Sequence, residues 1–284
     1  MKKYSTKKII ILTIILILSV VCLCLVSNKQ GFSTPTLKVF IYENSTEPTR
    51  TQNLEKLLTY FGYNDYSILG EGDPWEGWYG RNKKYREAIE RLDDDQFVLF
   101  SDGRDVIINN YCSEFIDRAT HLYDRIEKGV IFNSEQYCCN LGKEYTGTDE
   151  DAEKYKESIK AKFMSRAEPY NTIYPFLNAG VMFGKCRDFK ELFSNMDLKP
   201  GEDDQGVIMK MHLNDNYDDF YLDYKNELFC VSYGELEWDD AKKMYLNPIT
   251  GSYPFVIHFP AKVNAYVDSA EKLMNATVNE SPLV

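Results

Sequence analysis

The feature that most constrains the fold is FVLF, four consecutive apolar residues at positions 97–100. An apolar run without alternation predicts a strand that is buried on both faces, as at the centre of a mostly parallel sheet. The run leads directly into Ser-Asp-Gly-Arg-Asp, so Asp102 and Asp105 follow the strand within a tight turn. The sequence therefore predicts a buried central strand with two acids at its carboxyl end.

Apolar runs and amphipathic segments alternate along the rest of the chain. Strands are predicted from LKVFIYEN, YSILG, GVIFNSE, FLNAGVMFGK, YDDFYLD, ELFCVSY and SYPFVIHFPA. Helices are predicted over 53–61, 83–92, 112–126, 149–164 and 188–196, and a further one after the acids of GEDDQGVIMKMHLN. GEGDPWEGWYG is too rich in glycine for either regular element and predicts a loop. The order of elements predicts an α/β domain with a Rossmann-like, mostly parallel central sheet flanked by helices.

Composition limits the kinds of ligand that the chain can bind. It has 33 basic and 44 acidic residues and a formal net charge of −11. A chain so acidic offers no sustained basic stripe, which excludes a nucleic-acid-binding face. No CxxC pair occurs among the cysteines, which argues against a structural zinc site. An anionic ligand would require a metal ion or a local cluster of Lys and His.

The N-terminus predicts a membrane anchor. Residues 1–8 carry four lysines, and residues 9–26 are apolar and uncharged, a length at the short end of what spans a bilayer. We expect a cytoplasmic tail, a transmembrane signal anchor and a stem over 27–36, hence a single-pass type II membrane protein with its main domain in the lumen of the endoplasmic reticulum or Golgi. A cleaved signal peptide is the alternative. One domain would cover 37–267, followed by a C-terminal tail over 268–284.

Asp102, Asp105 and His258 are candidate metal ligands. Two carboxylates in a tight turn repel each other, but they suit a hard divalent cation. Ligands of open α/β sheets bind beyond the carboxyl ends of the strands, where these acids lie. His258 ends the last apolar strand, and Lys262 after it is a candidate phosphate partner. The alternatives are that Asp102 caps the next turn, that Asp105 is solvated and that His258 is a core residue.

Other polar residues sit where segments begin or end. Glu135 ends the strand VIFNSE, and Asn178 lies in LNAGV, where Gly180 would let a ligand approach the backbone. Asp203 and Asp204 open a predicted helix, for which a single acid would suffice as a cap. These positions predict more polar groups at one edge of the sheet.

Taken in order, VLFSDGRDV, VIFNSEQ, FLNAGVMFG, EDDQ and VIHFPAK resemble the glycosyltransferase domain of the procollagen lysyl hydroxylases and related collagen glucosyl- and galactosyltransferases. That family has FxDSYDV, a strand ending in Glu, LNSGG, DDQ and HGNG in the same order. The resemblance covers about residues 37–267, and WEGWYGRNKK is similar to the family's donor-loop segment. The chain departs from the family's pattern at three places. Arg104 stands where the family has a Tyr near the nucleotide base. Residues 136–139 lack the family's aromatic at its usual spacing, and HFPAK is shorter than HGNGPTK.

The resemblance implies a GT-A fold that binds Mn²⁺ and a UDP-sugar and moves a hexose, glucose or galactose, to an acceptor hydroxyl. The acceptor stays open between hydroxylysine or glycosylated hydroxylysine in a collagen-like protein, another side chain and a glycan. The metal would be held by Asp102, Asp105 and His258. The catalytic residues would be Asp203, Asp204, Glu135 and Asn178. The donor would also contact Trp75, Lys83, Lys84, Ser101 and Lys262.

Two other classes remain as alternatives. A catalytically silent lumenal adaptor would keep the fold, but it would tolerate loss of the acids and histidine that are intact here. A sugar nucleotidyltransferase or sugar-nucleotide hydrolase would release different products, and the first strand, KVFIYENSTEP, lacks a following glycine-rich phosphate loop.

Overall fold

A six-stranded sheet forms the centre of the computed structural model, which describes residues 36–46, 48–126, 129–139, 149–260 and 262–279. Its strands, in spatial order, are β2 (Tyr66–Leu69), β1 (Leu37–Tyr42), β3 (Phe97–Asp102), β6 (Phe176–Lys185), β5 (Val130–Glu135) and β7 (Phe220–Leu222). β1 pairs in parallel with β2 and β3, and β5 pairs in parallel with β7. β6 is antiparallel to both of its neighbours. The predicted α/β fold with a mostly parallel sheet is confirmed.

The antiparallel direction of β6 decides which of its residues reach the functional edge. Because β6 runs against β3, its first half lies beside the carboxyl end of β3, and Val181 is the register partner of Ser101. Asn178 and Gly180 therefore lie near Asp102, although they precede the middle of their own strand.

Two smaller sheets complete the β structure. In the first, β11 (Val256–His258) pairs antiparallel with β4 (Val106–Ile108) and parallel with β8 (Phe229–Val231). In the second, β9 (Glu237–Asp239) and β10 (Met244–Leu246) form a hairpin. The sequence interpretation named no strand at β4 and none in the hairpin.

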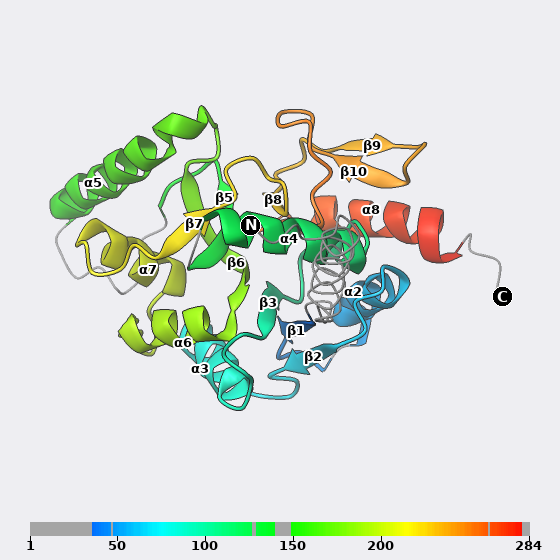
Figure 1. Cartoon of the computed structure of the whole chain (residues 1–284), viewed down its shortest axis with the longest axis horizontal. Coiled ribbons are helices and arrows are strands. Elements are labelled where there is room, and N and C mark those ends of the chain that lie inside the picture. The colour runs from blue at the N-terminus through cyan, green and yellow to red at the C-terminus, as the bar shows by residue number, and fades with distance from the viewer. Residues whose placement is uncertain (1–35, 47, 127–128, 140–148, 261, 280–284) are drawn as a thin grey trace, which may run out of the picture. The chain divides into compact units, whose positions relative to one another are not determined.

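Helices cover both faces of the central sheet, as Figure 1 shows. One buried cluster joins the sheet to α2 (Pro48–Tyr60), α4 (Cys112–Ile126) and α8 (Val263–Met274). The other joins it to α3 (Gly77–Ile89), α5 (Asp149–Ala167), α6 (Cys186–Asn195) and α7 (Asp204–Leu213). A 3₁₀ turn, Glu168–Tyr170, follows α5, and a π-helical segment, Asn275–Asn279, follows α8.

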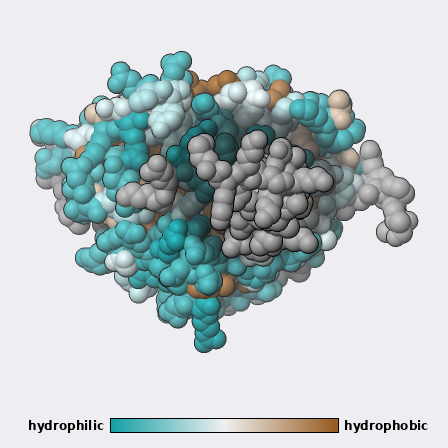
Figure 2. Space-filling view, in the orientation of Figure 1, coloured by the Kyte–Doolittle hydropathy of each residue, from teal (hydrophilic) through white to brown (hydrophobic). Residues whose placement is uncertain are grey.

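The FVLF strand supplies both layers. Phe97 and Leu99 belong to the first cluster, and Val98 and Phe100 belong to the second. Successive side chains of a strand point to opposite faces, so an uninterrupted apolar run fills two cores at once. With the apolar residues gathered inside, the face drawn in Figure 2 is largely hydrophilic where its residues are described.

Two boundaries differ from those expected. α3 begins at Gly77, inside the segment predicted as a loop, so the helix is longer at its start and its buried face includes Arg81 and Asn82. The predicted domain end at 267 falls within α8, whose Ala270 and Leu273 are fully buried in the first cluster. A compact unit begins at Leu37, and the described part of it continues past residue 267 through α8.

The prediction of a single-pass membrane protein is corrected. Among the helices in the described ranges, none is both long enough and apolar enough to cross a bilayer. The segments on which that prediction rested, residues 1–8, 9–26 and 27–35, lie outside the described residues.

Candidate active site

A cavity of about 450 Å³ opens where β3, β5 and β11 end and β6 begins. Polar side chains from seven elements or their adjoining turns surround it, namely α3, β3, β5, β6, α7, β8 and β11. Its described lining includes the carboxylates Asp102, Asp105, Glu135, Asp203 and Asp204. Arg81 and His258 also line it. The five acids predicted as metal-binding or catalytic come from three segments of the chain, and the fold brings all five to this cavity.

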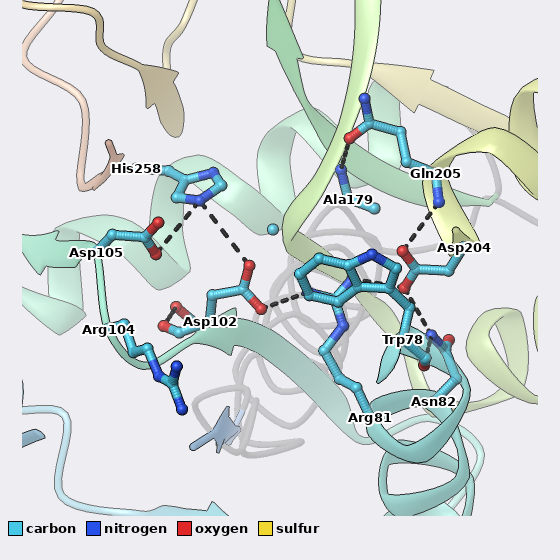
Figure 3. Close-up of polar contacts among 12 residues, drawn as sticks. Trp78, Arg81, Asn82, Asp102, Arg104, Asp105, Ala179, Asp204, Gln205 and His258 are labelled. Atoms are coloured by element: carbon cyan, nitrogen blue, oxygen red, sulfur yellow. Dashed lines mark hydrogen bonds and ion pairs between the residues drawn. The ribbon is translucent and has the colours of Figure 1, made fainter. Parts of the chain in front are cut away.

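Asp102, Asp105 and His258 converge because of the pairing of β4 with β11. Asp102 ends β3, and Asp105 directly precedes β4. His258 is the register partner of Val106 in β4, so it lies beside Asp105. The His258 Nε2 atom is 3.5 Å from Asp105 Oδ1 and 3.9 Å from Asp102 Oδ2 (Figure 3). One ligand atom from each residue lies within 4.8 Å of the others, close enough for one cation to bind all three.

Asn178 fixes the ring of His258. The Asn178 Oδ1 atom accepts from the Gly180 backbone N–H and lies 3.0 Å from His258 Nδ1. An amide oxygen can only accept, so Nδ1 carries a proton, and Nε2, which faces both acids, is the nitrogen whose lone pair a bound cation would take. A hydrogen bond of this kind at the far nitrogen orients histidines that bind metals.

The fit of the three side chains depends on a missing Cβ. A Cβ added at Gly180 would lie 2.3 Å from His258 Cε1 and 3.0 Å from Asp102 Oδ2. Glycine at this position therefore leaves the space that His258 and Asp102 occupy. Two carboxylates and one imidazole form an oxygen and nitrogen donor set that suits a divalent cation, so these residues fit a metal site.

Burial and charge shift the protonation of the same groups. Burial raises the pKa of the Asp102 carboxyl, and the charges of Arg81 and His258 offset part of that increase. Burial alone would lower the pKa of His258, but its hydrogen bond to Asp105 and the charges of Asp105 and Asp102 outweigh it and raise that pKa. The cluster therefore holds mutually compensating charges in a poorly solvated place.

Comparison with known proteins now agrees with this geometry. The sequence profile described as PLOD GT domain matches residues 38–281, most of the chain. The chain belongs to the PLOD glycosyltransferase-domain family. The resemblance found from the sequence motifs is thus confirmed, and the protein is a glycosyltransferase. A comparison with curated protein sequences finds no match.

Two solved structures are also similar. One is a glycosyltransferase involved in the glycosylation of the major capsid of PBCV-1, at 14% identity and a TM-score of 0.48, covering 85% of this chain and 100% of that one. The other is the apo form of the glycosyltransferase GlyE of Streptococcus pneumoniae TIGR4, at 12% identity and a TM-score of 0.34, covering 67% of this chain and 46% of that one.

The remaining predicted catalytic residues of this glycosyltransferase lie together on the other side of the cavity. Glu135 accepts hydrogen bonds from Tyr233 Oη at 2.6 Å and from Gln205 Nε2 at 2.9 Å, and a longer one of 3.4 Å from Asn178 Nδ2. Burial raises the pKa of the Glu135 carboxyl, and these hydrogen bonds offset part of the increase. Glu135 is therefore a fixed carboxylate at the cavity wall.

The two adjacent acids at the start of α7 have different partners. Asp203 is the N-cap, and its carboxylate accepts from the Gln205 backbone N–H at 2.9 Å. Asp204 accepts from the same N–H and also from Asn82 Nδ2 at 2.6 Å and from Arg81. Both acids thus accept at the start of the helix, and Asp204 is held in addition by two side chains of α3.

Arg81 was not predicted, yet it joins the two halves of the site. One guanidinium nitrogen donates to Asp102 Oδ1 and the other to Asp204 Oδ2, as Figure 3 shows. Its guanidinium carbon lies 4.5 Å from the centre of the Trp78 ring. The sequence did show a charged residue within WEGWYGRNKK. Because part of that stretch was predicted as a loop, the sequence interpretation did not show that Arg81 lies on a buried helix face.

The residues predicted to contact the donor lie in several places. Lys84 pairs with Asp73 at 2.7 Å, and Lys83 lines a separate cavity of about 230 Å³. Ser101 is buried, and its hydroxyl donates to the Asp102 backbone carbonyl. Lys262 is exposed just before α8. The large cavity includes none of these four among its described lining residues.

Trp75 lines a second, smaller cavity beside the candidate metal-ligand trio of Asp102, Asp105 and His258. That cavity has a volume of about 160 Å³, and its lining also includes Trp78, Asp102 and Arg104. Arg104 donates to both carboxylate oxygens of the buried Glu43, at distances between 2.8 and 3.0 Å. Asp102 and Asp105 line both cavities, so the trio lies where the two spaces meet.

Proposed function

We propose that the chain is a metal-dependent glycosyltransferase of GT-A type that moves a hexose, glucose or galactose, from a UDP-sugar to an acceptor hydroxyl. The observation that supports this most is the convergence of Asp102, Asp105 and His258 at the meeting point of two cavities. One cavity has an aromatic wall, and the other is lined by carboxylates. A nucleotide-sugar has a matching division into a base, a diphosphate and a polar sugar.

The proposed cation is Mn²⁺, held by those three residues. When bound, such an ion neutralises charge that develops on the diphosphate leaving group. Asn178 keeps His258 in the tautomer and orientation that binding requires. The carboxylate oxygens of Asp102 and Asp105 that face His258 supply the remaining protein ligands.

The other residues divide between the two cavities. Trp75 and Trp78, whose ring centres are 5.1 Å apart, would flank the nucleoside in the smaller cavity. Asp203 and Glu135 would orient the hydroxyls of the sugar and of the acceptor in the larger one. The proposed acceptors are hydroxylysine of a collagen-like protein, another protein side chain and a glycan. A donor and acceptor panel distinguishes these.

Calorimetric titration of UDP tests the proposal without any assumption about the sugar. We expect the purified protein to bind UDP with Mn²⁺ present and to lose that binding in EDTA. Asp102→Ala and His258→Ala should abolish the metal-dependent part, with circular dichroism confirming that both variants fold. A folded wild-type protein that binds no UDP in either condition would overturn the proposal. Release of UDP rather than pyrophosphate from a sugar donor distinguishes transfer from nucleotidyl transfer.

A further inference from the structure

The charge balance of the large cavity is uneven. Its described lining contains five carboxylates, and Arg81 is the single described lining residue with a permanent positive charge. The three lysines expected to offset phosphate charge do not appear among those lining residues. A diphosphate entering this space would meet strong repulsion from the acids unless positive charge lies close to its binding position.

Arg81 is held between Asp102 and Asp204. Its side chain is 3% exposed, and its two terminal nitrogens bind Asp102 and Asp204. The ion pair with Asp204 is buried and the one with Asp102 is partly buried, so solvent screens both less than it would screen surface pairs. The Arg81 Nε atom is buried and has no hydrogen-bond partner among the described residues. The stacked Trp78 ring and the two carboxylates together fix the guanidinium against the cavity wall.

Asp102 is shared between Arg81 and the metal-ligand trio. Its Oδ1 atom accepts from Arg81, and its Oδ2 atom faces His258 Nε2 at 3.9 Å. A cation bound by the trio and the Arg81 guanidinium would therefore lie on opposite oxygens of one carboxylate. Two positive charges bound to one carboxylate repel each other, and both attract an anion placed beside them.

We propose that Arg81 is the resident positive charge of the donor site. Without ligand it neutralises Asp102 and Asp204, and with a bound cation it supplies a second positive charge for the diphosphate. This inference rests on the proposed function. It has a consequence of opposite signs: Arg81 weakens the binding of a cation alone and strengthens the binding of a nucleoside diphosphate once the cation is present. A residue that merely positioned Asp102 would strengthen both.

The test compares Arg81→Gln with the matched control Arg86→Gln. Arg86 lies on the same helix but is exposed and lines the separate 230 Å³ cavity. Mn²⁺ alone is titrated and followed by the electron paramagnetic resonance signal of the free ion, and UDP is then titrated by calorimetry at saturating Mn²⁺. We expect Arg81→Gln to bind Mn²⁺ several-fold more tightly and UDP at least tenfold more weakly. Arg86→Gln should change neither.

Arg81→Lys keeps the inference testable if the Gln variant does not fold. Lysine keeps the charge but cannot bridge two carboxylates with a planar fork. Because the charge stays but the planar fork is lost, we expect Arg81→Lys to bind Mn²⁺ no more weakly than the wild type and to bind UDP more weakly, by less than about tenfold. Weakening of both in Arg81→Lys or in folded Arg81→Gln, or unchanged UDP binding in folded Arg81→Gln, would overturn the Arg81 proposal alone. Wild-type protein without metal-dependent UDP binding would overturn the proposed function and this proposal with it.

Discussion

Asp102 and Asp223 are both acids at the carboxyl ends of parallel strands, and their surroundings differ. Asp223 follows β7 and is 2% exposed, and its carboxylate accepts from the backbone N–H groups of residues 227, 228 and 229. Asp102 follows the same kind of strand, but its partners are side chains, Arg81 and His258, and it lines two cavities.

The difference separates an acid that stabilises the fold from one that we propose to be functional. Asp223 stabilises the loop that follows it, because its carboxylate oxygens accept hydrogen bonds from backbone N–H groups of that loop. Asp102 leaves one oxygen facing a second acid and a histidine, which an acid serving only the fold would avoid. One alternative drawn from the sequence was that Asp102 caps the turn after it. In the structure it is Asp223 that has this capping role.

The largest expected effect separates these two acids by activity. Asp102→Asn should lower sugar transfer by roughly a thousandfold, which corresponds to about 4 kcal/mol of transition-state stabilisation. It should change the thermal midpoint little, because Asn can still accept from Arg81. Rates of UDP release and scanning calorimetry on the same samples measure both. Near wild-type transfer by folded Asp102→Asn would remove the basis of the comparison.

The next effect concerns stability and pH at Asp223. Burial raises the pKa of its carboxyl from 3.8 to about 6, and the three backbone hydrogen bonds only partly oppose this. A folded-state pKa above the unfolded one means that the folded protein binds this proton more tightly. Stability from this group therefore falls as pH rises from about 4 to about 6, by roughly 3 kcal/mol.

Asp223→Asn isolates that contribution. Urea unfolding of both proteins across this pH range should show the wild type losing stability relative to the variant as pH rises. A difference between them that stays constant from pH 4 to pH 7 would show that Asp223 is not desolvated as described.

A smaller effect is expected from the glycine that makes room for the trio. In Gly180→Ala the new Cβ would displace His258, so Mn²⁺ affinity should fall about tenfold, or roughly 1.4 kcal/mol. Gly184→Ala is the matched control on the same strand, since its nearest neighbours would lie at 3.5 Å, an ordinary contact. Equal losses in the two variants would mean that the strand, and not His258, responds.

The smallest effect concerns Glu43, the acid that directly follows β1. Its carboxylate accepts from the Ser45 backbone N–H at 2.7 Å and from Arg104, so it combines the two kinds of partner. The Arg104 side chain is 48% exposed, which weakens the ion pair. Glu43→Gln should cost about 1 kcal/mol of unfolding free energy and lower UDP affinity by less than about threefold. A tenfold loss of UDP affinity would instead mean that Glu43, like Asp102, takes part in ligand binding.

Sequence reasoning recovered the elements with strong patterns and the acids that follow them. FVLF was predicted because it is an uninterrupted apolar run, and the helix over 112–126 because its apolar residues recur at helical spacing. The trio could be proposed because Asp102, Asp105 and His258 all end or follow apolar runs. Asp223 was not singled out, since a lone strand-end acid in YDDFYLD carries no sign of which donors will meet it.

Other features depend on contacts between distant segments. Nothing in the composition of β6 reveals that it runs antiparallel, and this direction brings Asn178 and Gly180 beside Asp102. Arg81 is 123 residues from Asp204 in the chain, and their ion pair exists only once α3 and α7 pack together. The glycines of WEGWYG suggested a loop, whereas α3 begins within that stretch, at Gly77, and its later residues Tyr85 and Ile89 pack in the second cluster.

The most direct measurement is pulsed electron paramagnetic resonance of the Mn²⁺–UDP complex. The chain contains three histidines, and His121 is exposed on α4, so His121→Gln is a control for His258→Gln. We expect modulation from one coordinated ¹⁴N nucleus in the wild type and in His121→Gln, and its loss in His258→Gln. A Mn²⁺–UDP complex of the wild-type protein without nitrogen coupling would contradict the assignment of Asp102, Asp105 and His258 as the metal site.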